Sequence, residues 1–162
     1  MSVLNRILSE LKQKKVDFEH IEHGFVHRSK EAASIRGNSL SQAAKAIVLK
    51  VKDKDSYYFM QAVLQGHRKI HMKTLKKLLS AKNISLASPA EVEEITGCTI
   101  GSVPPFGHLF GLEVIADKNL LEESKVVFSA GTHHDSVRLS SVDLFDVLNP
   151  KVLSFTVLND SS

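Results

Sequence analysis

A chain of 162 residues, 43% apolar and 24% charged, is long enough to bury the core of one compact domain. No apolar run approaches the length of a membrane span, and the N-terminus begins with an amphipathic pattern rather than a signal peptide, so we expect a cytoplasmic protein without a membrane partner. The net charge of +3 permits an acidic partner such as nucleic acid but does not require one.

The chain starts with alternating helix and strand signals. Apolar residues recur at three- and four-residue spacing over residues 3–11, which predicts an opening helix. Three segments follow: an extended stretch over 18–26, a helix over 30–35 that Gly37 ends, and a short helical turn over 40–44. Lys45 then lies at the junction with a buried strand predicted around residues 47–51.

The middle of the chain predicts a hairpin and two helices. A polar turn at residues 53–55 leads into a returning strand over 57–64. A surface helix with a basic outer face follows over residues 72–79. The segment Ser88-Pro89-Ala90-Glu91 is a capping box with proline at the first helical position, and it starts a helix that ends at Thr96 before Gly97.

The last third predicts three strands, over residues 112–116, 125–129 and 137–139, and a final helix that Ser141 caps and that runs through Leu148. Strands joined by both hairpins and helices indicate a mixed sheet in an α+β fold. We expect a single domain over residues 1–158 with a polar tail at 159–162. Neither glycine-rich nucleotide fingerprint occurs in the chain.

The only cysteine, Cys98, cannot form an internal disulfide, and its neighbours supply no redox motif, so we expect a buried thiol. The spacing of His20, His23 and His27 would suit a metal site on a helix. The segment is predicted to be extended, however, and it lacks a known zinc-binding spacing. We therefore predict no metal site.

The segment IGSVPPFG, residues 100–107, concentrates two prolines and two glycines in an uncharged stretch. Pro104 and Pro105 fix two φ angles, while Gly101 and Gly107 allow conformations or close approaches that a Cβ would forbid. Such a rigid loop presents backbone N–H and C=O groups at fixed positions, which suits a small polar ligand or a polarised carbonyl. A purely structural loop at a sheet edge is the alternative.

Three motifs taken together resemble the YbaK/ProX family of aminoacyl-tRNA deacylases, which is related to the editing domain inserted in bacterial prolyl-tRNA synthetase. They are Ala44-Lys45 before an apolar strand, the IGSVPPFG segment, and Phe128-Ser129-Ala130-Gly131 before an extended stretch. The resemblance covers most of the chain and implies a mixed, barrel-like sheet with flanking helices. It also implies trans-editing: hydrolysis of the ester between a wrong amino acid and tRNA, without metal or organic cofactor.

The resemblance also implies the site. Lys45 falls on a lysine that contacts the terminal adenosine and its phosphate, and Gly101 to Pro105 fall on a loop that binds the aminoacyl end; we therefore predict Lys45, Gly101 and Pro105 as catalytic. The predicted substrate-binding residues are Ser102, Val103, Pro104, Phe106, Gly107, Gly131, His133 and His134. Water, or a substrate thiol in cysteine-specific members, attacks the carbonyl, so no side-chain nucleophile is needed.

Several alternatives stay open at this level. Lys45 could be a solvated lysine at a helix end, and His133 and His134 could form a surface turn, as Phe106 could belong to the core. Ser136 aligns with an aspartate found in some members, which leaves the amino acid undetermined. The fold could also serve as a silent module that binds a tRNA end or a nucleotide, or as an unrelated small hydrolase.

Partners follow from the same resemblance: mischarged tRNA, and an aminoacyl-tRNA synthetase as a further candidate, with the chain a monomer or homodimer. Gly66-His67-Arg68-Lys69 with the lysines at 73, 76 and 77 form the densest basic region, which could meet acceptor-stem phosphates or be a solvated face.

Overall fold

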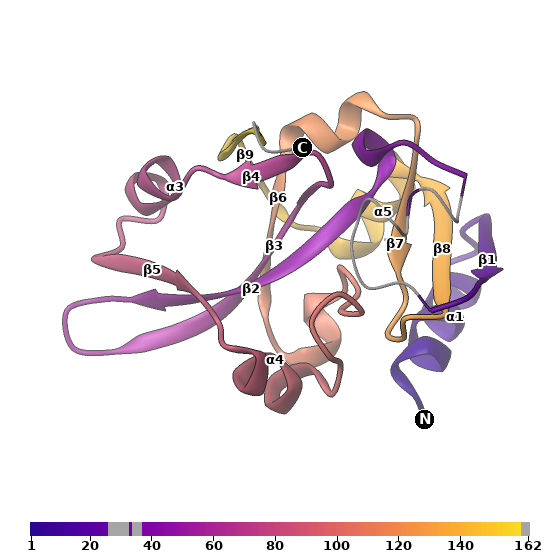
Figure 1. Cartoon of the computed structure of the whole chain (residues 1–162), viewed down its shortest axis with the longest axis horizontal. Helices are drawn as coiled ribbons and strands as arrows, with labels where there is room; N and C mark the ends of the chain where they lie inside the picture. The colour runs from indigo at the N-terminus through magenta and orange to yellow at the C-terminus, as the bar shows by residue number, and fades with distance from the viewer. Residues whose placement is uncertain (26–32, 34–36, 160–162) are drawn as a thin grey trace.

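The computed structural model describes residues 1–25, 33 and 37–159 (Figure 1). The α-helices are α1 (Val3–Gln13), α3 (Met72–Leu78), α4 (Pro89–Thr96) and α5 (Ser141–Leu148), and the 3-10 helices are η1 (Leu40–Gln42), η2 (Gly107–Phe110) and η3 (Lys118–Glu122). The strands are β1 (Phe18–Glu22), β2 (Ala44–Lys52), β3 (Tyr57–Gln65), β4 (Arg68–Ile70), β5 (Asn83–Leu86), β6 (Glu113–Asp117), β7 (Lys125–Ser129), β8 (Asp135–Ser140), β9 (Lys151–Leu153) and β10 (Thr156–Leu158).

The main sheet has the strand order β5-β2-β3-β6-β9 and is mixed, because β2 and β3 form an antiparallel hairpin whereas β6 runs parallel to both of its neighbours. A second, antiparallel sheet has the order β1-β8-β7, and β10 pairs with β4. The predicted α+β class is confirmed. The described strands do not close into a barrel, because β5 and β9 stand at opposite ends of the main sheet without pairing with each other.

Two large apolar clusters hold the layers together. One packs α1 and α5 against the second sheet and includes Ile7 and Leu11, so the predicted stripe of the opening helix faces inward. The other cluster packs α3 against the main sheet. A third, smaller cluster joins Val48 of β2 to Val92 of α4 and to Val103, and thereby fixes residues 100–107, here called the proline loop, against β2. Cys98 belongs to this cluster and is buried, as predicted.

Several boundaries differ from the sequence predictions. The cap of α5 is Ser140, not Ser141, because the Ser140 hydroxyl accepts the Asp143 N–H while the Ser141 hydroxyl donates to the Glu123 carbonyl. Lys45 lies within β2, so its interpretation as a residue at a helix end is wrong.

The extended stretch predicted over 18–26 contains β1 as its first five residues. The helix predicted over 30–35 lies outside the described residues except for position 33, and positions 160–162 of the expected tail lie outside them as well. Strands β4, β5, β9 and β10 have three or four residues each, too few for an alternating pattern to be recognised in the sequence. Within the described part of the chain, no helix is long and apolar enough to cross a membrane.

Candidate active site

One buried side chain, Gln61 of β3, holds the proline loop in place through two hydrogen bonds. Its Nε2 donates to the Pro104 carbonyl at 2.9 Å, and its Oε1 accepts the Gly107 N–H at 2.8 Å. Gln61 is fully buried, so both halves of its amide are satisfied by the loop alone. Glycine is required at 107 by close packing, since a Cβ there would lie 2.6 Å from Val114 Cγ2.

The start of the loop is tied to the turn between β7 and β8. The Gly131 N–H donates to the Ser102 carbonyl at 2.9 Å. Gly101 and Gly131 have φ angles of 93° and 94°, a region that favours glycine. The structure therefore brings together two of the three motifs that carried the family resemblance, although about thirty residues separate them in the chain.

His133 reaches the same place from the turn. Its Nε2 is hydrogen-bonded to Thr99 Oγ1 at 2.7 Å, and that hydroxyl lies 3.4 Å from Ser102 Oγ. The exposed Phe25 ring lies against the His133 imidazole, with ring centroids 4.7 Å apart. His133 is thus held beside the proline loop. Thr99 and Phe25 were not singled out by sequence, because neither belongs to a motif.

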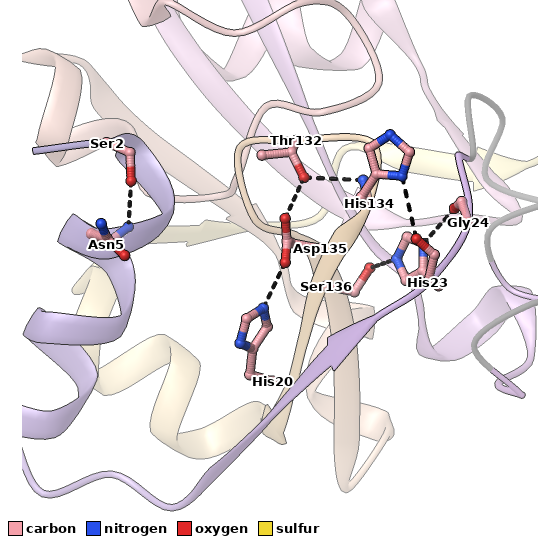
Figure 2. A network of polar contacts seen from close by, with 9 residues as sticks. All are labelled: Ser2, Asn5, His20, His23, Gly24, Thr132, His134, Asp135 and Ser136. Atoms are coloured by element: carbon pink, nitrogen blue, oxygen red, sulfur yellow. Dashed lines mark hydrogen bonds and ion pairs between the residues drawn. The ribbon is translucent and has the colours of Figure 1, made fainter.

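A polar network fixes the turn that carries His133 (Figure 2). The two carboxylate oxygens of Asp135 accept hydrogen bonds from His20 Nε2 at 2.7 Å and Thr132 Oγ1 at 2.6 Å. Burial would raise the pKa of Asp135, but the hydrogen bonds from Thr132 and His20 outweigh it and hold that pKa below its ordinary value. The His134 N–H donates to Thr132 Oγ1, which completes the turn.

His23 lies in a separate branch of this network (Figure 2). Its Nε2 is 2.8 Å from Ser136 Oγ, and the His134 ring Nδ1 lies 3.3 Å from the His23 carbonyl. Ser136 is fully buried, so the residue aligned with the aspartate of some members points into the protein. His134 is exposed and meets the His23 carbonyl, whereas His133 meets Thr99 beside the loop.

The histidines do not share a partner. His20 meets Asp135 and His23 meets Ser136, while His27 lies outside the described residues. Ligand atoms of His20, Glu22 and Asp135 lie within 4.8 Å of one another, a spacing that could hold a cation. Both oxygens of Asp135 accept hydrogen bonds, one from His20 and one from Thr132.

Lys45 is half-buried on β2, and its Nζ donates to the Gly66 carbonyl at 3.4 Å. Burial lowers the pKa of Lys45. Burial also lowers the pKa of the neighbouring His67, helped by the charges of Arg68 and Lys45. The hydrogen bond of Lys45 does not reach the proline loop; the next residue, Ala46, comes closer because it lines a cavity together with the loop.

That cavity has a volume of about 180 Å³ and lies between β2, the end of β5, α4 and the proline loop. Its lining is apolar apart from backbone: Ala46, Ile47, Val48, Leu86, Ala87, Val92, Ile100, Gly101 and Val103. The predicted site residues Gly101 and Val103 therefore line this cavity.

Other predicted residues lie deeper. Phe106 is fully buried and packs on Phe128 at 5.3 Å between ring centroids, and Gly107 and Pro104 are buried with their backbone groups taken by Gln61. Burial shows that these three residues support the shape of the loop, while their role in substrate binding stays a prediction. Pro105 is buried as well and fixes the φ angle of the loop.

Comparison with known proteins identifies the family of the chain. Residues 23–147 match the model of the aminoacyl-tRNA editing domain. The chain belongs to the aminoacyl-tRNA editing family. It is 34% identical over 151 residues to the multifunctional Ser/Thr-tRNA deacylase ProXp-y of Escherichia coli K12, covering 93% of this chain and 90% of that protein.

Two further similarities connect the editing family to prolyl-tRNA synthetase. The chain is 30% identical over 135 residues to proline–tRNA ligase of Caldicellulosiruptor bescii, covering 83% of this chain but 22% of that enzyme. A solved structure of a candidate trans-editing enzyme for prolyl-tRNA synthetase superimposes with a TM-score of 0.78 at 23% identity, over 97% of this chain and 98% of that one, which supports the fold. The predicted family is confirmed, and so is the predicted activity: this editing-family member is an aminoacyl-tRNA deacylase that acts on mischarged tRNA.

Proposed function

We propose that the proline loop, Lys45 and the 130–135 turn form the active site of this deacylase, which acts in trans and releases serine or threonine from mischarged tRNA. The observation that carries the proposal is the hydrogen bond between Ser102 and Gly131, with His133 held to Thr99 beside it. It joins a rigid backbone segment to a polar turn at the edge of an apolar cavity.

The reaction needs no side-chain nucleophile. A water oxygen attacks the ester carbonyl carbon, the bond from that carbon to the ribose oxygen breaks, and the ribose oxygen leaves with a proton, giving free amino acid and tRNA. The Gly101 N–H has no hydrogen-bond partner recorded among residues 1–25, 33 and 37–159, and it lies at the exposed start of the loop. It is our candidate donor to the oxyanion that forms in the transition state.

The other groups bind and orient the substrate. The Lys45 ammonium, half-buried on β2, contacts the phosphate of the terminal nucleotide as a charged donor. His133 contacts the aminoacyl group, and Ser102 holds the turn in register with the loop. His134, being exposed and turned toward His23, contributes less to binding.

The amino acid class is inferred from the relative. The E. coli protein is a Ser/Thr-tRNA deacylase, and it aligns with 93% of this chain. The Thr99 hydroxyl and the His133 ring nitrogen are hydrogen-bonded to each other beside the loop, and such a polar pair suits a small hydroxyl side chain.

A panel of charged tRNAs tests the proposal. The wild type is incubated with tRNAs that carry serine, threonine, alanine, cysteine or proline, and single-turnover hydrolysis rates are compared. We expect the seryl and threonyl esters to be cleaved fastest and His133→Ala to slow them more than His134→Ala does. Fastest cleavage of the cysteinyl or prolyl ester would contradict the substrate class.

We also propose that the protein works in the cytoplasm and that a synthetase supplies its substrate, since an editing domain of this family occurs within proline–tRNA ligases. The oligomeric state, monomer or homodimer, stays a prediction, and analytical ultracentrifugation checks it directly.

A further inference from the structure

The apolar cavity lies along one edge of strand β2. It is lined by three consecutive residues, Ala46, Ile47 and Val48, although side chains alternate between the two faces of a strand. The cavity therefore lies beside the edge of β2 and not over one of its faces. α4 and the proline loop cover the sheet next to this edge, as the cluster of Val48, Val92 and Val103 requires (Figure 1).

This edge of β2 is interrupted. β5 pairs with residues 49–52, and the edge pairing ends where the Ala87 N–H donates to the Val48 carbonyl at 3.0 Å. At the other end, Ala43 bridges to Val127 of β7. Between these two pairings the register leaves a gap at Ala46.

The backbone of Ala46 points into that gap. Successive residues of a strand direct their N–H and C=O groups to opposite edges, so Ala46 directs its pair to the same edge as Val48. No strand pairing on that edge is recorded for Ala46 among residues 1–25, 33 and 37–159. A donor and an acceptor thus lie side by side at the wall of an apolar cavity.

Two exposed apolar side chains mark the same cavity. Leu86 is 60% and Ile100 is 46% exposed, and both belong to the lining. Large apolar side chains left in solvent beside a hollow favour a flat apolar ligand that would cover them. The volume of about 180 Å³ is below the range of sites for whole drug-sized ligands, so one ring system fits better than a nucleotide.

We propose that this cavity binds the adenine base of the terminal adenosine of tRNA, and that the Ala46 C=O and N–H read its 6-amino group and the adjacent ring nitrogen. This inference rests on the proposed function. Adenine carries a donor next to an acceptor, which complements the edge of one strand residue, and its faces are apolar. An aminoacyl side chain with a hydroxyl group would find no side-chain partner in this lining.

The proline loop then divides the substrate between its two sides. Gly101 and Val103 line the adenine cavity, whereas the Ser102 carbonyl holds Gly131, next to His133, on the turn side. The ribose and the ester would cross the loop at Gly101.

The test compares RNA ends. Fluorescence anisotropy measures binding of an uncharged acceptor-stem RNA that ends in adenosine or in inosine, whose 6-carbonyl replaces the amino donor by an acceptor. We expect the wild type to bind the adenosine end about tenfold or more tightly. Val92→Phe, which fills the cavity, and Ile100→Ser, which removes an exposed apolar contact, should weaken binding of the adenosine end and reduce the preference. Leu121→Ser is the matched control, because Leu121 is 41% exposed, close to Ile100, and lies outside the cavity lining.

Equal binding of both ends by the wild type would overturn the inference, even if the esters are hydrolysed. Loss of seryl- or threonyl-ester hydrolysis in Val92→Phe with an unchanged preference for adenosine would also overturn it, because the cavity would then hold the amino acid. A preference for adenosine in a protein that hydrolyses no ester would support the inference and contradict the proposed function.

Discussion

At the scale of single residues, Gln61 is the side chain on which the geometry of the loop depends most. Gln61→Leu would remove both partners of the loop and leave the Pro104 carbonyl and the Gly107 N–H buried without hydrogen bonds. Unsatisfied buried groups cost about 1–3 kcal/mol each, so we expect a lower free energy of unfolding together with a loss of kcat/KM.

Gln65→Leu is a matched control on the same strand, since Gln65 is equally buried but bonds to Ser41 and Arg68 instead of the loop. Urea denaturation should show similar destabilisation for the two variants, whereas kcat/KM should fall only for Gln61→Leu. Equal activity losses would mean that stability, and not the position of the loop, limits catalysis.

The lowered pKa of Lys45 gives a second prediction at this scale. The unfolded chain holds this proton more tightly than the folded chain does, so stability should increase as pH rises between the lowered folded-state pKa and the ordinary value of 10.5. Lys45→Met removes this dependence. We expect chemical denaturation at pH 8 to 10 to give a flatter pH profile for Lys45→Met, with no loss of stability at neutral pH; an unchanged slope would contradict the burial of the ammonium.

At the scale of elements, the turn between β7 and β8 is fixed by Asp135. A carboxyl whose pKa is lowered in the folded state stabilises the protein above its ordinary pKa and loses that contribution as pH falls through the folded-state value. Asp135→Asn should therefore lower the melting temperature at pH 7 and flatten its decline in acid. Asp146→Asn on α5 serves as the control, and a parallel acid profile for Asp135→Asn and the wild type would refute the role of the pair with His20.

Helix α3 carries the lysines predicted to meet RNA phosphates. Lys73, Lys76 and Lys77 are exposed on this helix, whereas Arg68 is bonded to Gln65 and Thr156. If α3 meets the acceptor stem, replacing these three lysines by glutamine should reduce the slope of log K against log salt by about 1 for each lost contact. Replacing Lys12 in the last turn of α1 and Lys15 just beyond this helix provides the comparison. An unchanged slope for the α3 variant would identify the α3 lysines as a solvated face.

The elements also show what sequence could predict. The capping box at Ser88, the stripe of α1 and the β2–β3 hairpin were predictable because their signals are local. The clamp by Gln61 was not, since a glutamine inside an apolar strand carries no pattern, and its two partners lie more than forty residues away. The strand edge at Ala46 was equally hidden, because it depends on where β5 and β7 end.

At the scale of the whole molecule, the residues of the proposed active site come from both sheets. The main sheet supplies Lys45, Ala46 and Gln61, and the second sheet supplies the turn with Gly131 and His133. The proline loop joins them through the Gln61 clamp on one side and the Gly131 hydrogen bond on the other. The family resemblance pointed to Lys45, Gly131 and His133, and the fold shows how the proline loop meets the turn that carries the last two.

The most direct test of this account is hydrolysis of threonyl-tRNA by the wild type, Lys45→Ala and Lys50→Ala. Lys50 lies on the same strand but pairs with Glu91 at 3.3 Å, away from the Gly66 carbonyl. The account predicts cleavage by the wild type and Lys50→Ala, and a loss of about tenfold or more in kcat/KM for Lys45→Ala, as for a charged hydrogen bond. Equal rates for all three proteins would contradict the proposed active site.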